Sequence, residues 1–477
     1  MKMLIGGKQV DASDGKVIDV VNPATGKVID TVPSATQEDV QTAVDKAAEG
    51  QKIWAKVPVY RRAEILMKFL ELVEEDKESL AQTLSQETGK PIREARAEIG
   101  NISIAFKGFA ERAKHLYGKT IPAGMEAGQD RHMLITVREP IGVVACVIPF
   151  NFPCDLFDQK VAPTLLAGNA AIVKPSTDNP LTLCRLSALL AKAGVTDGAI
   201  EILTGRGSTV GTWLCENPGV HAITLTGSTE VGIQTAKNGA GHMAHIALEL
   251  GGNDAFILLK DGDVDLAVEE LIWGRLYNGG QVCCASKRFL IQNSRKEEFT
   301  KKAIARIKQL KFGDPADDTT DIACLISEGA AKKVEKEVEL TVRQGGKILL
   351  GGKRNGAFYE PTVISDIPAD ADVAKDLEIF GPVVSIIGFE TEEEAVKIAN
   401  QSKYGLCGCV FTSDMKTAAR VAGQLECGGV VINGASFFRS FEMPFGGYKY
   451  SGVGTEGVMS TFDEVTHLKT VVLKNIG

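Results

Sequence analysis

The chain has 477 residues, which exceeds the usual size of one domain, so two or three domains are expected. Hydrophobic residues make up 44% and charged residues 24%, as in globular proteins, and these values exclude disordered and collagen-like chains. The formal net charge of −8 disfavours nucleic acid as a partner, because binding of phosphates needs a basic surface.

The ten cysteines are spread thinly along the chain, and no two of them have the spacing of a CxxC zinc motif. We therefore expect reduced cysteines, no bound metal and a cytoplasmic protein. The first residues lack the long apolar core of a signal peptide. The strongest apolar run, residues 141–150, is too short to span a bilayer, so no membrane association is expected.

The first 140 residues change from a strand pattern to a helix pattern and back. Residues 1–35 carry short apolar runs between turn signals, which is typical of hairpins. From Arg61 to Leu84, apolar side chains recur with the period of one helix, and Gly89 ends it. Residues 117–140 are interrupted by glycines and a proline before a strand resumes. Such an excursion is suited to an arm that makes contacts in an oligomer.

Two series of alternating strands and helices follow. In the first series, strands are expected at 143–148, 170–173, 200–203, 222–225 and 246–249. In the second series, they are expected at 255–259, 289–291, 346–350, 383–389 and 429–432, with helices such as 296–307 and 392–400. Repeated βα units predict parallel sheets with helices on both faces and ligands at the carboxyl ends of the strands. The tail, residues 468–473, is one more strand whose edge needs a partner, for which a neighbouring subunit is a candidate.

Glycines crowd the backbone just before a cysteine pair, in the segment Asn278-Gly279-Gly280-Gln281-Val282-Cys283-Cys284. Small residues at this place would let a thiol lie at the bottom of a narrow cleft, with its own amide N–H free to face a ligand. Because most free cysteines are simply buried, the alternative is a pair of structural cysteines.

One carboxylate ends an apolar strand, in Leu248-Glu249-Leu250-Gly251-Gly252. Burial would raise the pKa of Glu249 and make it a general base near neutral pH. The alternative is a carboxylate at the mouth of the strand that is turned to solvent or paired with a lysine.

Three other strand ends carry candidate ligand-binding groups. Asn151, between two prolines and two phenylalanines, offers a rigid amide donor for an oxyanion. Lys174 is placed to contact the ribose or phosphate of a cofactor. The segment Thr226-Gly227-Ser228 opens a helix whose first amides can hold pyrophosphate. The alternatives are a proline-rich turn, an exposed lysine and an ordinary capped helix.

Taken together, these segments resemble the aldehyde dehydrogenase superfamily over nearly the whole chain. The motifs follow the order of that family: Pro149-Phe150-Asn151-Phe152-Pro153, Lys174-Pro175-Ser176, Thr226-Gly227-Ser228, Glu249-Leu250-Gly251-Gly252, Gly280-Gln281-Val282-Cys283, Glu378-Ile379-Phe380-Gly381-Pro382 and Pro444-Phe445-Gly446-Gly447. Any one motif could occur by chance, but the ordered set is highly specific.

The resemblance implies an enzyme that oxidises an aldehyde with NAD or NADP. Cys283 would be the nucleophile, and Asn151 with the amide of Cys283 would form the oxyanion hole. Glu249 would activate the water that cleaves the thioester. Lys174 would hold the adenosine ribose, Glu378 the nicotinamide ribose and Ser228 the pyrophosphate. Further cofactor contacts are expected from Pro149, Phe150, Ser176, Thr177, Gly227 and Phe380.

The implied fold is α/β and has three parts. A Rossmann-like coenzyme domain takes residues 1–117 and 141–250, and an α/β catalytic domain takes residues 251–450. A small β oligomerisation arm combines residues 118–140 and 451–477. We expect this arm to pair across subunits and to give a homodimer or homotetramer.

Two positions indicate the coenzyme and the substrate. Many NAD-preferring relatives have a glutamate where this chain has Thr177, and a carboxylate there would repel a 2′-phosphate, so we expect NADP to be accepted. Arg439 and Gln159 fall where relatives that act on apolar aldehydes have aromatic walls. With Phe152 and Phe445, they predict a pocket for a small polar or anionic aldehyde, such as lactaldehyde or a semialdehyde. A surface ion pair is the alternative for Arg439.

Several rival functions remain open on the sequence. Glu249 argues against a CoA-acylating semialdehyde dehydrogenase, because such relatives typically lack that carboxylate. Sulfolactaldehyde and glyceraldehyde 3-phosphate, the latter in a non-phosphorylating oxidation, remain candidate substrates. A catalytically inert structural or binding protein on the same fold is disfavoured, since it would not need Cys283, Glu249, Asn151 and Lys174 together.

Overall fold

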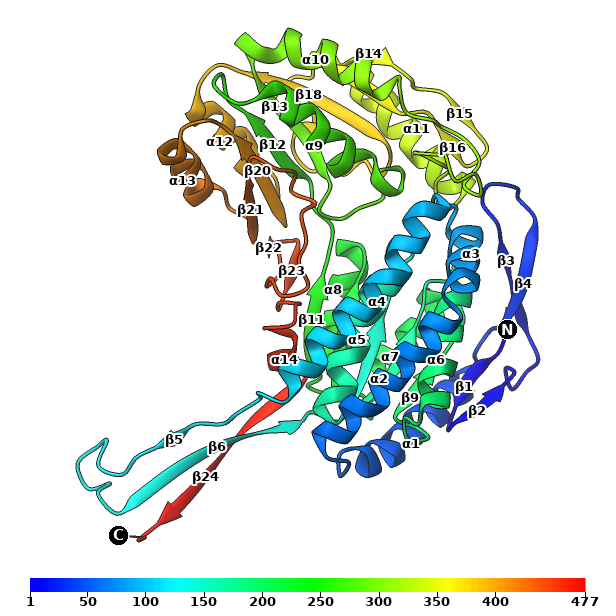
Figure 1. The fold of residues 1–477 in the computed structure, drawn as a ribbon, viewed down its shortest axis with the longest axis vertical. Coiled ribbons are helices and arrows are strands. Elements are labelled where there is room, and N and C mark those ends of the chain that lie inside the picture. The colour runs from blue at the N-terminus through cyan, green and yellow to red at the C-terminus, as the bar shows by residue number, and fades with distance from the viewer. Residues whose placement is uncertain (477) are drawn as a thin grey trace.

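The computed structural model describes residues 1–476 and contains two large sheets, each covered by helices, and a projecting β ribbon (Figure 1). The first sheet has the strand order β2 (Lys8–Val10), β1 (Met3–Ile5), β9 (Ile200–Ile202), β8 (Ala170–Lys174), β7 (Val143–Val147), β10 (Ala222–Thr226), β11 (His245–Glu249) and β23 (Gly452–Val453). The five strands from β9 to β11 are parallel, as the βα pattern predicts. This confirms the first α/β series.

Helices cover both faces of this sheet because alternate strand residues point to opposite sides. One face packs on helices that include α2 (Val59–Glu75), α4 (Ile92–Ala113), α5 (Pro153–Ala167) and α6 (Leu181–Ala193). The other face packs on α1 (Gln37–Trp54) and α7 (Thr212–Glu216), and α8 (Thr229–Ala240) lies beside α7. Along β7, Val144 and Cys146 belong to the first core, and Val143 and Ala145 belong to the second.

The second sheet has the strand order β14 (Lys347–Leu350), β17 (Thr362–Ser365), β18 (Val383–Phe389), β13 (Ser286–Gln292), β12 (Asp254–Leu258), β20 (Cys407–Phe411) and β21 (Gly429–Ile432). All of its pairs are parallel except β14 with β17. The helices α11 (Glu328–Arg343), α12 (Glu392–Asn400) and α13 (Met415–Gln424) pack on one face, and α9 (Val264–Leu276) and α10 (Asn293–Ile307) pack on the other. The sequence analysis located five of these strands and two of the helices.

The arm is a ribbon of three antiparallel strands, β24 (Thr466–Lys474), β6 (His132–Pro140) and β5 (Thr120–Ile121), that projects away from both bodies (Figure 1). The tail strand therefore finds its first partner in the same chain, where β24 pairs with β6 along its whole length. The other edge of β24 has no partner strand within residues 1–476. Pairing of the arm with a second subunit stays a prediction.

The expected helix from Arg61 to Leu84 is wrong as one element, because the structure divides it into α2 and α3 (Lys77–Thr88). Asp76 lies between them with φ −105° and ψ 7°, and its carboxylate pairs with Arg185 on α6 at 2.6 Å. Aspartate competes with the helix for hydrogen bonds, so it favours such a junction. Gly89 ends α3 in the left-handed conformation, as expected.

The remaining elements are short connectors. They are β3 (Val17–Val21), β4 (Val28–Pro33), β15 (Arg354–Asn355), β16 (Phe358–Tyr359), β19 (Tyr404–Gly405), β22 (Tyr448–Lys449), α14 (Thr461–Glu464), η1 (Gly207–Gly211), η2 (Tyr277–Gly280) and η3 (Asp372–Ala374). The pair of β3 and β4 is the hairpin expected near the start of the chain. Within residues 1–476, no helix combines the length and the apolar character that crossing a bilayer requires.

Candidate active site

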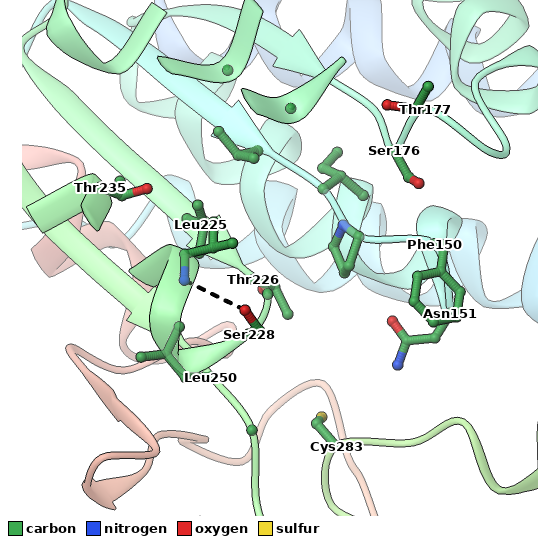
Figure 2. Close-up of a pocket in the computed structure, with 18 of the residues that line it drawn as sticks. Phe150, Asn151, Ser176, Thr177, Leu225, Thr226, Ser228, Thr235, Leu250 and Cys283 are labelled. Atoms are coloured by element: carbon green, nitrogen blue, oxygen red, sulfur yellow. Dashed lines mark hydrogen bonds between the residues drawn. The ribbon is translucent and has the colours of Figure 1, made fainter. Parts of the chain in front are cut away.

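A cavity of about 730 Å³ opens where the carboxyl ends of β7, β8 and β10 face the second α/β body. Its wall includes eleven of the residues that the sequence analysis singled out: Pro149, Phe150, Asn151, Lys174, Ser176, Thr177, Gly227, Ser228, Cys283, Glu378 and Phe380. Figure 2 shows Ser176 and Thr177 at one end of this space and Cys283 at another, with Asn151 between them. One continuous cavity thus joins the candidate nucleophile to the candidate cofactor contacts.

The end of the cavity near Ser176 is built by the chain leaving β8. Lys174 is buried, and loss of solvent lowers the pKa of its ammonium group to about 8, while Nζ donates to the carbonyl of Pro175. Thr177 Oγ1 donates to the carbonyl of Gly205 at 3.2 Å. Ser176 and Thr177 both face the cavity (Figure 2). This end therefore offers a cation and hydroxyl groups to a ligand.

The start of α8 forms a second wall. Ser228 is the N-cap of this helix, and its hydroxyl accepts a hydrogen bond from the amide of Val231 at 3.4 Å (Figure 2). Gly227 and Ser228 line the cavity directly before the first turn. The amides of a helix start attract anions, so a pyrophosphate fits at this wall. The same segment can therefore be a capped helix start and a site for pyrophosphate.

The opposite wall comes from the second body. Glu378 pairs with Lys287 at 3.1 Å and accepts from the amide of Gly252 at 3.3 Å. A Cβ atom on Gly251 would lie 2.4 Å from Glu378 Oε2, so the glycine lets the carboxylate approach the strand end. The ring of Phe380 stands edge-on to Phe150 across the cavity, with centroids 6.0 Å apart. Glu378 and Phe380 therefore offer the cavity a hydrogen-bond acceptor and an aromatic ring.

A tight turn brings Cys283 into the cavity. Asn278, Gly279 and Gly280 all have positive φ values, between 51° and 76°, where glycine is favoured. A Cβ atom on Gly280 would meet the carbonyl oxygen of Gly381 at 2.3 Å. Glycine is thus required at this turn by both backbone conformation and space. The glycine cluster that precedes the cysteine pair in sequence has its physical explanation here.

Asn151 is fixed from three sides. Its side-chain amide donates to the carbonyl of Gln281 at 3.0 Å, two residues before Cys283. Its own carbonyl accepts from Lys90 Nζ at 2.9 Å and from Asn278 Nδ2 at 2.8 Å. The amide of Asn151 thus stays beside the loop of Cys283, as an oxyanion donor would need to be.

Lys90 supports this arrangement and was not recognised from the sequence. It is 1% exposed, forms an ion pair with buried Glu98 on α4, and lies 4.6 Å over the ring of Phe152. Glu98 also accepts from the amide of Cys154 at 2.8 Å, at the start of α5. A lone lysine after Gly89 carries no signal in the sequence, because its partners lie on other elements.

The thiol and the candidate base both favour their neutral forms. A hydrogen bond with Cys284 and burial raise the pKa of the Cys283 thiol well above its usual range. Burial, helped by nearby Glu456, raises the pKa of Glu249 well above that of an ordinary glutamate. Glu249 is 5% exposed, and neither of its carboxylate oxygens has a hydrogen-bond partner among residues 1–476. Buried carboxylates normally have hydrogen-bond partners. Glu249 lacks them and is therefore a candidate proton acceptor.

A group of packed side chains lies beside Cys283. Phe152, Cys283 and Phe445 pack in one small apolar cluster, and the guanidinium of Arg439 stacks on the Phe445 ring at 3.5 Å. The positive charge of Arg439 partly opposes the rise in the pKa values of Glu249 and Cys283. Three of the four residues predicted for a substrate pocket therefore meet beside the thiol.

Gln159 is the fourth residue of that prediction and is less clearly connected. It lies on α5, is 1% exposed, and neither atom of its amide finds a partner within residues 1–476. The aromatic cluster around Phe152 includes residues that the sequence analysis missed. Tyr277 and Phe437 contact Phe152, and Trp273 contacts Phe437. Trp273 and Tyr277 come from one segment and Phe437 from another, both far from Phe152 in the sequence, so no local motif indicated them.

The cysteines and acidic residues give no other candidate centre. All ten cysteines are free. Across residues 1–476, no group of three or more His, Cys, Asp or Glu side chains is arranged to hold a metal ion.

Comparisons with known proteins identify the family of this chain. A sequence model of the aldehyde dehydrogenase family matches residues 10–471. Lactaldehyde dehydrogenase of Methanococcus vannielii is 36% identical over 99% of this chain and 100% of that protein. The 3-sulfolactaldehyde dehydrogenase of Priestia aryabhattai is 37% identical over 96% of this chain and 94% of that protein. The crystal structure of an E. coli NADP-dependent enzyme has a TM-score of 0.96 and 35% identity, over 99% of this chain and 98% of that one. The chain therefore belongs to the aldehyde dehydrogenase family and is an NAD(P)-dependent oxidoreductase.

Proposed function

We propose that this protein oxidises a small polar or anionic aldehyde to the free carboxylic acid through a thioester on Cys283. The observation that carries the proposal is the single cavity that joins Cys283 and Asn151 to Lys174, Ser228 and Glu378. The coenzyme, when bound, accepts the hydride that leaves the substrate carbon. Lys174, Ser228 and Glu378 would hold the coenzyme. The chain's own residues carry out the other steps at the substrate carbonyl.

In the proposed reaction, the Cys283 sulfur attacks the aldehyde carbon after its proton passes to a base. The oxygen of the adduct gains negative charge and is stabilised by the Asn151 amide and the backbone N–H of Cys283. Loss of hydride leaves a thioester. Glu249 then takes a proton from water, the hydroxide attacks the thioester, and the C–S bond breaks to return the thiol.

The substrate end of the proposal rests on Arg439. Its Nη1 atom is buried, and no hydrogen-bond partner for it is found among residues 1–476. A guanidinium beside a reactive thiol, with an unused donor, fits a carboxylate, sulfonate or other anionic group on the substrate. The names of the two relatives, lactaldehyde and 3-sulfolactaldehyde dehydrogenase, support a small hydroxylated aldehyde.

The central test is the absorbance of reduced nicotinamide with purified protein, NAD or NADP, and a panel of small aldehydes. We expect coenzyme reduction without CoA, loss of activity in Cys283→Ala, and activity retained in Cys284→Ala. Activity that survives in Cys283→Ala would place the nucleophile elsewhere. Turnover that depends on CoA would favour the acylating alternative. Strong preference for glyceraldehyde 3-phosphate would favour a non-phosphorylating glyceraldehyde-3-phosphate dehydrogenase.

Arg439→Leu tests the anion site directly. We expect kcat/KM for an anionic aldehyde to fall by about tenfold to a hundredfold relative to a neutral aldehyde, since a charged hydrogen bond contributes about 1.5–3 kcal/mol. Arg343→Leu, at an exposed position on α11, is the matched control and should leave this ratio unchanged. An unchanged ratio in Arg439→Leu would show that Arg439 has a structural role and does not bind the anionic group of the substrate.

We also propose that NADP is accepted, because Thr177 and Ser176 line the end of the cavity near Lys174. Thr177→Glu should repel a 2′-phosphate and lower the ratio of NADP to NAD activity by about tenfold or more. Strict use of NAD by the unaltered protein would contradict the proposal.

A further inference from the structure

Asn278 begins the tight turn before Cys283, and the proposed reaction gives it no role. Its φ of 51° is in the region that glycine adopts most easily, and the next two residues of the turn, Gly279 and Gly280, are glycines. Asparagine tolerates this conformation and brings a side-chain amide with it. Because a glycine would satisfy the backbone here equally well, the backbone alone does not explain the asparagine.

The side chain of Asn278 closes a ring of three buried amides. Asn278 Nδ2 donates to the backbone carbonyl of Asn151 at 2.8 Å. Asn151 Nδ2 donates to the backbone carbonyl of Gln281 at 3.0 Å, and Gln281 Nε2 donates to that of Asn278 at 3.0 Å. Within the ring, each residue donates one hydrogen bond and accepts one. The ring therefore connects the position of Asn151 to the turn that leads to Cys283.

Segments of both α/β bodies hold this ring in place. The backbone amide of Asn278 donates to Glu94 Oε2, on α4, at 2.9 Å. The side-chain oxygen of Gln281 accepts from the backbone amide of Ile326, just before α11, at 2.9 Å. Burial raises the pKa of Glu94 to about 8, so its carboxyl group is mostly protonated at neutral pH and still offers an acceptor oxygen.

The backbone carbonyl of Asn151 accepts from two side chains, Lys90 Nζ and Asn278 Nδ2. Lys90 lies just before α4, whereas Asn278 lies in the segment that carries Cys283. Asn278 therefore holds the backbone of the proposed oxyanion donor against the segment of the nucleophile, which Lys90 does not do. Such a contact matters because a displacement of about 1 Å at a reacting centre can lower the rate by about a hundredfold.

We propose that Asn278 is a positioning residue that sets the Asn151 amide relative to the Cys283 thiol, with Glu94 holding the backbone of Asn278. The inference rests on the proposed function, in which Asn151 stabilises the oxyanion. Asn151 and Cys283 line the cavity and Asn278 does not, so Asn278 would act through Asn151.

The test is a double-mutant cycle of Asn278→Gly and Asn151→Ala, measured as kcat/KM for one aldehyde. Asn278→Gly removes the side-chain donor and leaves a residue that suits the backbone. We expect it to lower kcat/KM by about tenfold to a hundredfold, mostly through kcat. Asn151→Ala should lower kcat/KM by about a hundredfold to a thousandfold. In that background, adding Asn278→Gly should cost no more than about twofold, because no oxyanion donor is left to position.

Two changes at Glu94 test the support of the ring. Glu94→Ala removes the acceptor for the backbone amide of Asn278 and should also lower kcat. Glu94→Gln keeps an acceptor oxygen and should retain most of the activity. In these variants and in Asn278→Gly, the Kd of the reduced coenzyme, measured by its fluorescence, should stay within about twofold of that of the unaltered protein.

Asn433→Gly is the matched control. Asn433 is exposed, has a φ of 56°, and its side chain forms two hydrogen bonds with the backbone of Thr412. The same change of residue type in the same backbone conformation should leave kcat/KM unaltered.

The outcomes separate this inference from the proposed function. Equal fractional losses from Asn278→Gly with and without Asn151 would assign Asn278 a structural role and overturn the inference. A loss that lies mainly in coenzyme binding would overturn it as well. No loss in Asn151→Ala would overturn the inference together with the oxyanion role of Asn151. Turnover that requires Cys283 would still leave the thioester mechanism standing in each case.

Discussion

At the scale of single residues, the proposed chemistry depends on two groups whose pKa values the surroundings raise. The thiol of Cys283 and the carboxyl of Glu249 both have pKa values raised well above their usual ranges. A neutral thiol is a poor nucleophile, so attack on the aldehyde needs a proton acceptor. Deacylation needs a proton acceptor as well, and Glu249, with two unpartnered oxygens, is the group that we propose takes the proton of the attacking water when it is ionised.

Glu249→Gln tests this assignment. An amide cannot accept the proton of the deacylating water, so we expect kcat to fall by about a hundredfold to ten-thousandfold. If thioester formation persists, rapid mixing should show a burst of reduced coenzyme of up to one equivalent per site, followed by slow turnover. Glu464→Gln, a change of the same kind on α14, is the control. Full steady-state activity in Glu249→Gln would contradict the assignment.

The raised pKa of Glu249 also gives a pH dependence with a definite sign. The base is the carboxylate form, which exists above the pKa and is lost as the pH falls through it. Deacylation should therefore slow as the pH is lowered, and this acid limb should be absent in Glu249→Gln. Measuring kcat as a function of pH for the unaltered protein and for Glu249→Gln tests this expectation.

At the scale of elements, the start of α5 is positioned by α4 and by the loop before it. Lys90 connects Glu98 on α4 to the carbonyl of Asn151, and Glu98 holds the amide of Cys154. The proposed oxyanion donor, Asn151, is thus held by an ion pair removed from water. Such a pair adds little over an apolar replacement but is costly to break from one side.

Lys90→Met should therefore destabilise the protein strongly. It leaves Glu98 buried without its cation, at an expected cost of about 3–5 kcal/mol in the free energy of unfolding. Lys77→Met breaks an exposed pair with Glu74 and should cost about 1 kcal/mol or less. Denaturation by urea compares the two variants. Similar midpoints would show that the buried pair contributes no more than the exposed one.

At the scale of the whole molecule, the arm is the part that its own chain covers least. All residues of β24 from His467 to Lys474 are exposed, including Leu468 at 60% and Val472 at 52%. The outer edge of β24 has unpaired backbone groups within the described chain. Exposed apolar side chains on an open strand edge mark a surface for another chain. A second copy of this protein remains our predicted occupant.

Ending the chain after Val465 tests the oligomerisation arm. Removal of β24 should convert the predicted homodimer or homotetramer to a smaller species, measured by light scattering after size-exclusion chromatography. Val472→Asp keeps the strand but adds a charge at an exposed position, and it should weaken the same assembly. An unchanged mass in both proteins would show that the arm does not join subunits.

The sequence by itself determined much of this protein. The βα periodicity predicted both parallel sheets, because burial on both faces requires continuous apolar strands. The ordered motifs placed Cys283, Glu249 and Asn151, since glycines and prolines at strand ends leave a local signal. The break of the helix at Asp76 was missed because the apolar period continues past it, while the hydrogen bond that favours the break comes from Arg185.

Only the tertiary structure decided which distant side chains surround the thiol. Lys90 and Tyr277 carry no motif, and their positions depend on how α4, α5 and the turn before Cys283 pack together. The sequence predicted that burial would raise the pKa of Glu249, but not that Glu456, from a distant segment, would add to this rise. Local patterns encode backbone conformation, whereas the electrostatics and selectivity of a site arise from contacts between segments far apart in the chain.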